Sequence, residues 1–230
     1  MDFSYIRRNY SKIKEEVSRI AKEMGVPEPL LVAVTKSASE EEVRFLVSEI
    51  GVTHIAENRT VLFNARYDMF DPASRPKMHL IGNLQTNKVK TIVGKPELIQ
   101  SVDSLRLAKE IDRQSEKAGV VSSVLLEINS GREENKGGCM PEEAEALAEE
   151  IAAFSHLSLE GVMTMGPLVE EEAVLRRCFR ETREIFCRIG AKGLFRVEEP
   201  VLSMGMSGSY GAAIREGATM IRVGRGLFIQ

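Results

Sequence analysis

The sequence is poor in cysteine and histidine, with three of each, and it carries no excess of positive charge. Cys139, Cys178 and Cys187 form no CxxC pair and lie at no metal-ligand spacing from a histidine, which argues against disulfides and zinc. A formal net charge of −3 provides no basic surface for nucleic acid and no polybasic block for an anionic membrane. We therefore expect reduced intracellular thiols, no metal site, and neither nucleic acid nor membrane as a partner.

Long apolar runs are also missing. No stretch approaches the roughly 20 apolar residues of a membrane-spanning helix. The N-terminal segment instead places apolar side chains at helical spacing among charged ones, which is typical of an amphipathic surface helix rather than a secretory signal. These side chains are Ile6, Ile13, Val17, Ile20 and Met24. A cytoplasmic location is the expectation.

Short β-type runs alternate with helical stretches from residue 30 to the end of the chain. The runs cover residues 30–35, 52–56, 78–82, 98–102, 123–129, 159–165, 200–204 and 219–224. Strict alternation implies parallel strands joined by right-handed helical crossovers. Eight such units in 230 residues predict an α/β protein, a single-domain (β/α)8 TIM barrel over residues 1–230 with an extra N-terminal helix.

An open doubly wound sheet is the structural alternative, although GxGxxG, its usual marker after the first strand, is absent. The last strand run ends a few residues before Gln230, so no helix is expected after it. The N-terminal helix could cover the position left bare.

A lysine ends the first strand run, in PLLVAVTKSASEEEV at residues 29–43. Because strand side chains alternate, Lys36 shares the face of Val32 and Val34, which points into a barrel. Lys36 then stands at the C-terminal mouth, where barrel enzymes hold their chemistry. A lysine partly desolvated there can attack an aldehyde as the neutral amine and form a Schiff base. Position alone favours the alternative, a solvated lysine that caps the strand.

Two glycine-containing loops follow the last two strand runs. One holds Gly205, Ser207, Gly208 and Ser209, and the other is IRVGRG at residues 221–226. Backbone N–H groups in such loops bind anions, and phosphate sites in these barrels recur after strands seven and eight. Either loop alone could be a tight turn. Because closure sets strand eight beside strand one, the two loops and the lysine together indicate a small phosphorylated aldehyde.

Arg222 shares a strand face with Met220 and Gly224, so it is expected one layer deeper in the barrel than the phosphate loop. A buried guanidinium requires a partner, which could be a structural carboxylate or a ring nitrogen. Facing a pyridine nitrogen, an arginine would keep that nitrogen unprotonated and make the ring a poor electron sink. Transamination and decarboxylation would then be disfavoured.

Several ordered motifs carry a resemblance over almost the whole chain. They are AVTKS, IAENR, HLIGNLQTNKVK, SVDSLRLA, EINSGREENKGG, GVMTM and LSMGMSGSYGAAIREGATMIRVGRGLF. Together they resemble the pyridoxal phosphate homeostasis family, the small single-domain relatives of the alanine racemase N-terminal barrel. The resemblance implies pyridoxal 5′-phosphate (PLP) held as a covalent imine on Lys36. It also implies phosphate contacts from Ser207 and Gly224, ring contacts around Asn58, and Arg222 at the pyridine nitrogen.

The chain departs from that family at three places. Arg225 stands where a small or hydroxylated residue is usual, and it could supply charge to the phosphate instead. Ala56 replaces the usual glycine before Glu-Asn, and the chain ends in LFIQ rather than in Phe-Gly.

A carrier fits this chain better than a racemase. Racemisation on PLP needs a base on each face of the Cα plane, and Lys36 supplies one. In alanine racemases the second is a tyrosine of an extra C-terminal domain, for which this chain is too short. Its tyrosines are Tyr5, Tyr10, Tyr67 and Tyr210. We expect a non-catalytic, monomeric protein that buffers PLP or supplies it to apo-enzymes. A Schiff-base aldolase, a weak amino-acid racemase and a vestigial interaction module are the alternatives.

Some polar residues have no evident role in that site. His79 opens the third strand run and is expected to pack there, whereas His54 and His156 show no partner pattern and are interpreted as structural or surface groups. Glu57 and Asp103 follow strands two and four, so they could reach the mouth or form ion pairs.

Overall fold

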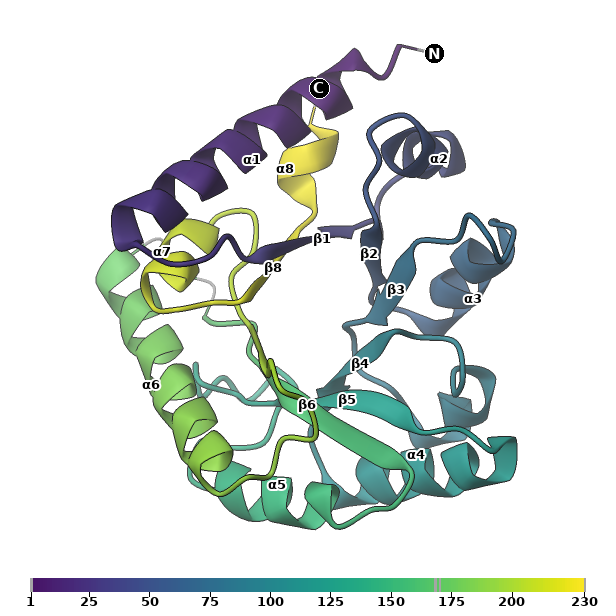
Figure 1. Ribbon diagram of the computed structural model, residues 1–230, viewed down its shortest axis with the longest axis vertical. Coiled ribbons are helices and arrows are strands. Elements are labelled where there is room, and N and C mark those ends of the chain that lie inside the picture. The colour runs from purple at the N-terminus through teal and green to yellow at the C-terminus, as the bar shows by residue number, and fades with distance from the viewer. Residues whose placement is uncertain (1, 168, 170, 230) are drawn as a thin grey trace.

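The computed structural model of the protein describes residues 2–167, 169 and 171–229. Eight parallel strands close into a barrel in sequence order, each paired with its neighbours and β8 paired with β1 (Figure 1). The strands are β1 (Leu30–Val34), β2 (His54–Glu57), β3 (Lys77–Leu80), β4 (Leu98–Val102), β5 (Ser122–Glu127), β6 (Leu157–Met163), β7 (Val201–Ser203) and β8 (Met220–Val223). The ends of each predicted run agree with those of its strand to within two residues. The predicted (β/α)8 barrel is confirmed, and the open-sheet alternative is wrong.

Helices surround the barrel and cover the outer faces of the strands (Figure 1). They are α1 (Ser4–Met24), α2 (Glu40–Ser48), α3 (Thr60–Asp68), α4 (Leu105–Ala118), α5 (Ala144–Ala152), α6 (Glu172–Ala191), α7 (Tyr210–Arg215) and α8 (Arg225–Phe228). The connection from β3 to β4 is a 3₁₀ helix, η1 (Thr86–Thr91). Helix α2 begins at a capping box, in which the Ser39 hydroxyl accepts from the Glu42 N–H and the Glu42 carboxylate accepts from the Ser39 N–H. No helix in the described part of the chain has the length and apolar character of a membrane span.

Helix α1 is the predicted amphipathic N-terminal helix. Ile6, Ile13, Val17 and Ile20 are buried, as expected from their spacing. Met24 lies in the last turn and is exposed, because the helix stops at Gly25, which takes a left-handed conformation with φ of 65°. The buried apolar face of α1 therefore ends one turn before Met24, the last residue of the apolar pattern in the sequence.

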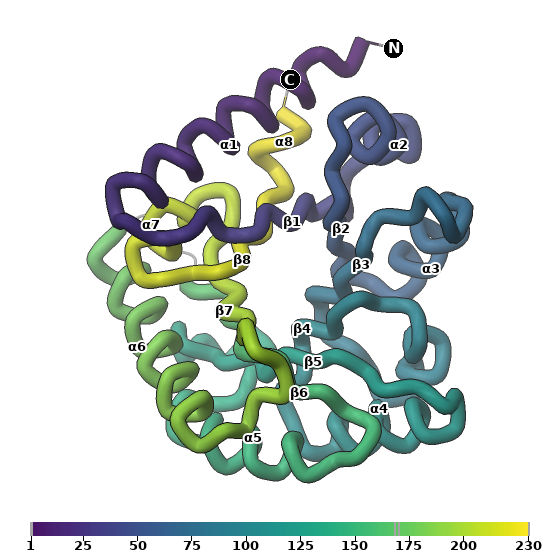
Figure 2. Tube along the Cα trace, in the orientation of Figure 1, coloured from purple at the N-terminus to yellow at the C-terminus, as the bar shows by residue number. Residues whose placement is uncertain are grey.

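A short helix follows the last strand, so the expectation that none would do so is wrong. Helix α8 packs against α1, and α1 also covers α7 (Figure 2). The Asn9 amide donates to the carbonyl oxygens of Leu227 at 3.2 Å and Ile229 at 2.7 Å. The end of the chain is thus tied to the N-terminal helix, which covers the position beside β8 as predicted.

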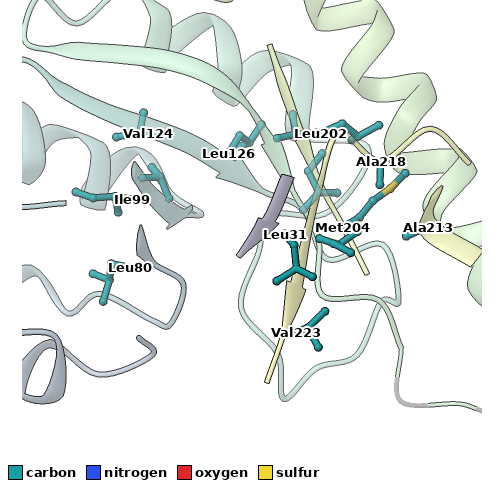
Figure 3. Packing of buried hydrophobic residues seen from close by; sticks show 14 of the residues in the cluster. Leu31, Leu80, Ile99, Val124, Leu126, Leu202, Met204, Ala213, Ala218 and Val223 are labelled. Atoms are coloured by element: carbon teal, nitrogen blue, oxygen red, sulfur yellow. The ribbon is translucent and has the colours of Figure 1, made fainter. Parts of the chain in front are cut away.

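The apolar core has two layers, separated by the strands. The larger layer lies between strands and helices, and Figure 3 shows part of it, with Leu80, Ile99, Val124 and Leu126 on adjacent strands and Ala213 on α7. The smaller layer fills the barrel interior. Its buried members are Val32, Val34, Ala56, Ile81, Leu98, Leu125, Met163 and Met220. Alternation along each strand assigns neighbouring residues to opposite layers, and polar residues on the inner face are consequently sealed inside the barrel.

Candidate functional site

Lys36 lies two residues beyond the end of β1, on the face of the inward-pointing Val32 and Val34. The backbone there turns sharply, with the Thr35 N–H bonded to Ala56 O and the Ala38 N–H bonded to Thr35 O, both at 3.0 Å. Lys36 therefore stands at the C-terminal mouth, the predicted position. It is exposed, however, and not partly desolvated as expected from the sequence.

A buried polar pair holds the turn that carries Lys36. Glu57 is fully buried and accepts a 2.5 Å hydrogen bond from the Thr35 hydroxyl. Arg66 donates to Ala38 O at 2.6 Å, and its Nε lies 3.8 Å from the Glu57 carboxylate. Burial raises the pKa of Glu57, against the opposing effects of the Thr35 hydrogen bond and the Arg66 charge. Ion pairing, one of the two expectations for Glu57, is confirmed, and the pair braces both sides of Lys36.

Ser207 and the glycines after β8 form a cradle of hydrogen-bond donors. The Gly224 and Gly226 N–H groups both point at the Ser207 Oγ, at 3.2 and 3.3 Å. Gly205 adopts a φ of 93°, which favours glycine, and an added Cβ there would meet Ala213 at 2.6 Å. At Gly224 an added Cβ would come within 3.2 Å of Val34 O. Glycine thus allows both loops to approach closely, and it leaves two N–H groups converging on one hydroxyl.

The cradle and the lysine share one edge of the barrel. Strands β1 and β8 pair with Val32 opposite Arg222 and Ala33 opposite Val223. Gly224 packs against Val34, so the next inward position on β1, that of Lys36, lies beside the loop that follows Gly224. Figure 2 shows this adjacency of the first and last strands. The two loops predicted to bind phosphate are therefore brought together next to the lysine.

Arg222 is buried below the mouth, with 2% of its surface exposed. Its Nη1 donates to the Ser203 Oγ at 2.6 Å and its Nη2 to Thr164 O at 2.8 Å. Burial lowers its pKa to about 10, with the Glu127 charge opposing the shift, so the guanidinium stays protonated at neutral pH. Among the described residues no carboxylate forms an ion pair with it. The carboxylate partner allowed by the sequence is not observed, and several of the five guanidinium N–H groups are left for another acceptor.

Asn58 and Arg225 complete the set of predicted residues. Asn58 follows β2 and is half-buried. Gly82 packs directly on its carbonyl oxygen, where any Cβ would overlap. Ala56, in place of the usual glycine, fits within the inner apolar layer. Arg225 is the exposed first residue of α8 and has no hydrogen bond or ion pair to the described residues, so its charge is available at the rim.

This arrangement fits a phosphorylated aromatic aldehyde. An exposed amine lies beside a pair of amide donors suited to phosphate oxygens, and a buried guanidinium with spare donors lies beneath them. Residues 2–230 match the family described as alanine racemase, N-terminal domain. A protein of Aquifex aeolicus named pyridoxal phosphate homeostasis protein is 36% identical over 95% of both chains. The chain belongs to the pyridoxal phosphate homeostasis family.

Other relatives agree with this assignment. A protein of the same name from Pseudomonas aeruginosa is 32% identical over 98% of this chain and 95% of that one. The structure of Synechococcus elongatus PipY with PLP bound has a TM-score of 0.83 at 27% identity, covering 97% of this chain and 100% of that one. Alanine racemase of Clostridium difficile shares the fold, with a TM-score of 0.82 at 17% identity, but this chain covers 57% of it.

Glu127 also belongs to the region of the site, and the sequence patterns did not reveal it. It ends β5, alternating with the outward Val124 and Leu126, and is 5% exposed. Burial and the Asp103 charge raise its pKa to about 7, against the opposing charge of Arg222. The sequence does contain a signal for Glu127, because a charged residue ends an apolar strand run here as it does at Lys36.

His79 and His54 form a pair inside the barrel. The His79 ring is buried, as predicted, and burial first and the neighbouring His54 second lower its pKa to about 3. His54 Nδ1 lies 2.9 Å from His79 Nε2, so His54 is a structural group, one of the two expectations, with a partner that the sequence pattern did not show. The spacing between the two histidines, on separate strands, concealed this contact.

Glu127 should make the stability of the protein depend on pH. Its pKa is about 7 in the fold against an ordinary value of 4.5, so the folded state holds more protons between these values. The free energy of unfolding should fall as pH rises from about 4.5 to 7, by up to about 3 kcal/mol at 1.36 kcal/mol per pKa unit. Glu127→Gln should remove this loss. Urea denaturation at pH 5 and pH 8 measures it.

His79 changes the free energy of unfolding with pH in the opposite direction. The free energies of unfolding of the variant and the wild type must therefore be compared at each pH. Its pKa is lowered, so its contribution is present above about 6.5 and is lost as pH falls toward 3. The difference between the two proteins cancels this effect. An equal free-energy difference at pH 5 and pH 8 would contradict the assignment.

Proposed function

We propose that this protein binds PLP at the barrel mouth, covalently through Lys36, and buffers or supplies it without turning over a substrate. The observation that carries the proposal is the cradle: two backbone N–H groups converge on Ser207 beside an exposed lysine. Sequence relatives named for PLP homeostasis, and the PipY structure with PLP bound, support the same ligand.

Different residues of the chain would hold different parts of the ligand. Lys36 would hold the ligand through its amine nitrogen, by condensation with an aldehyde and loss of water. PLP supplies an aldehyde that reacts reversibly with amines, so a later amine can displace Lys36 and take the ligand away. The Gly224 and Gly226 N–H groups and the Ser207 hydroxyl hold the phosphate, and the exposed Arg225 adds positive charge at the rim.

Asn58 and Arg222 are proposed to contact the ring. Asn58 is placed at the mouth by the close packing of Gly82 on its carbonyl group. A spare Arg222 N–H would face the ring nitrogen and keep it unprotonated, because the guanidinium itself does not give up a proton at neutral pH. An unprotonated ring withdraws electrons weakly, which disfavours chemistry at the Cα of a bound amino acid.

The tyrosines support the absence of racemisation. The Tyr210 hydroxyl donates to Glu16 of α1 at 2.5 Å, and the Tyr5 hydroxyl bonds to Glu42 of α2, both outside the barrel. Tyr67 stacks on Phe63 along α3. Tyr10 is on α1. None of these positions supplies a second base opposite Lys36.

Four further features belong to the proposal. PLP-dependent apo-enzymes are the expected recipients, and the protein acts as a monomer. The chain from residue 1 to 230 works as one domain, since α1 and α8 pack together across the barrel closure. The three free cysteines favour a cytoplasmic setting.

Lys36→Ala should abolish the covalent attachment of PLP. Wild-type protein mixed with PLP should absorb visible light and, after borohydride reduction, carry the label on the peptide that contains Lys36. Lys88→Ala, which removes an exposed lysine of η1, should behave as wild type. Labelling of another lysine in the wild type would show that the site is misassigned, and a colourless wild type would favour an aldolase or an interaction module.

Ser207→Ala should weaken PLP far more than unphosphorylated pyridoxal. A hydrogen bond to a charged oxygen contributes about 1.5 to 3 kcal/mol, so PLP affinity should fall roughly 10- to 100-fold. Ser209→Ala is the matched control, because the Ser209 hydroxyl bonds to the Met206 N–H in the same loop and not to the cradle. Titration by absorbance gives both dissociation constants. Equal weakening of PLP and pyridoxal would place the phosphate elsewhere.

Proton exchange at Cα should stay near background. The PLP-loaded protein, incubated with L-alanine in deuterated water, should neither exchange the Cα proton nor form D-alanine, because a second base is missing and Arg222 keeps the ring a weak electron sink. NMR and chiral chromatography measure both, with an alanine racemase as the positive control. Turnover near the control's rate would make the protein a racemase and refute the carrier proposal.

A further inference from the structure

A chain of hydrogen bonds, buried except at its His54 end, connects Arg222 near the mouth with His54 at the opposite end of the barrel. Arg222 Nη1 donates to Ser203 Oγ at 2.6 Å, and Ser203 Oγ donates to Gln100 Oε1 at 2.7 Å. Gln100 Nε2 lies 3.1 Å from His79 Nδ1, and His79 Nε2 lies 2.9 Å from His54 Nδ1. The chain crosses the barrel interior, because β4 lies opposite β8 in the closed sheet (Figure 1).

His79 determines the direction in which these bonds point. Burial lowers its pKa to about 3, so the ring is neutral at pH 7 and carries one proton. Gln100 Nε2 has two hydrogens, which point to His79 Nδ1 and, at 3.2 Å, to Met220 Sδ. Nδ1 of His79 is then the acceptor, and its proton lies on Nε2, directed at His54. Every link donates away from Arg222.

The reverse orientation of the Gln100 amide would leave polar atoms without partners. Its NH₂ group would face Ser203 Oγ, which already accepts from Arg222, and the hydroxyl hydrogen of Ser203 would lose its acceptor. The amide oxygen would also face Met220 Sδ, which has no hydrogen to donate. Unpaired donors and acceptors in a buried site are costly, so one orientation of Gln100 is selected.

We propose that Gln100 is a positioning residue for Arg222: by accepting the Ser203 hydrogen it fixes Ser203 as the acceptor that aims the guanidinium at the ring of bound PLP. The inference rests on the proposed function. Thr164 O holds the second Nη, so Ser203 and Thr164 together fix the plane of the guanidinium. Gln100 is fully buried on β4, which lies opposite β8 in the closed sheet, so it does not reach the cradle and is linked to Arg222 through Ser203.

The proposal is tested with PLP labelled with ¹⁵N in the ring. Gln100→Leu removes the acceptor of Ser203, and the dissociation constants of PLP and pyridoxal should both rise roughly 2- to 10-fold, the range of one hydrogen bond. The ring ¹⁵N signal should shift toward the protonated form. Gln100→Glu keeps an acceptor for Ser203 and should restore both values. Leu98→Val, on the same inner face of β4, is the control and should leave both unchanged.

Unchanged binding and an unchanged ring signal in Gln100→Leu would overturn the proposal, as would an equal loss in Gln100→Glu. If Gln100→Leu does not fold, Ser203→Ala removes the next link and should give the same rise in both dissociation constants. A wild type that binds no PLP would refute the proposed function itself.

The orientation of Gln100 is tested without any ligand. The chain has three histidines, so ¹⁵N NMR of the imidazoles is readily assigned, with His156 as the internal reference. Wild-type His79 should carry its proton on Nε2. In Gln100→Glu the second carboxylate oxygen faces His79 and should draw a proton onto Nδ1. A wild-type proton on Nδ1 would overturn the assigned direction whether or not PLP binds.

Discussion

The pairing of β1 with β8 is the contact on which the rest of the site depends. It closes the barrel and sets Val32 opposite Arg222, which brings the first 36 residues of the chain against the last few. A slip of two residues would keep the inward faces inward, yet it would move the cradle by roughly 7 Å relative to Lys36. The register is held by Gly224, whose missing side chain lets Val34 approach, and by α1, which covers α7 and α8.

Closure of the barrel also removes several titratable side chains from water. The barrel interior contains Arg222, Glu127 and two histidines among apolar side chains, and each group loses hydration there. The structure compensates in different ways: burial lowers the pKa of both histidines, Arg222 donates to two acceptors, and burial raises the pKa of Glu127 to about 7. A core of this kind is less stabilising than an apolar one of the same volume, and the polar groups define how Arg222 is oriented.

The likeness to alanine racemase is a likeness of fold. The fold is common to both, whereas this chain covers little more than half of the racemase. The barrel alone contains the lysine, the cradle and the buried arginine. The proposed covalent but reversible hold on an aldehyde needs no more than these.

Much of the fold and of the candidate site could be predicted from the local sequence pattern. Strand–helix alternation determined the barrel, because parallel strands need crossovers, and two-residue alternation determined that Lys36 and Arg222 face inward. The loop glycines predicted where the cradle lies. The sequence did not reveal α8, since four residues carry no periodicity, nor the exposure of Lys36, which depends on neighbouring loops. It also concealed the effect of the Asp103 charge on Glu127 and the contacts of Gln100 with His79 and Ser203. These pairs lie on different strands, and only closure of the sheet, which depends on register and shear over the whole barrel, decides which inward side chains meet.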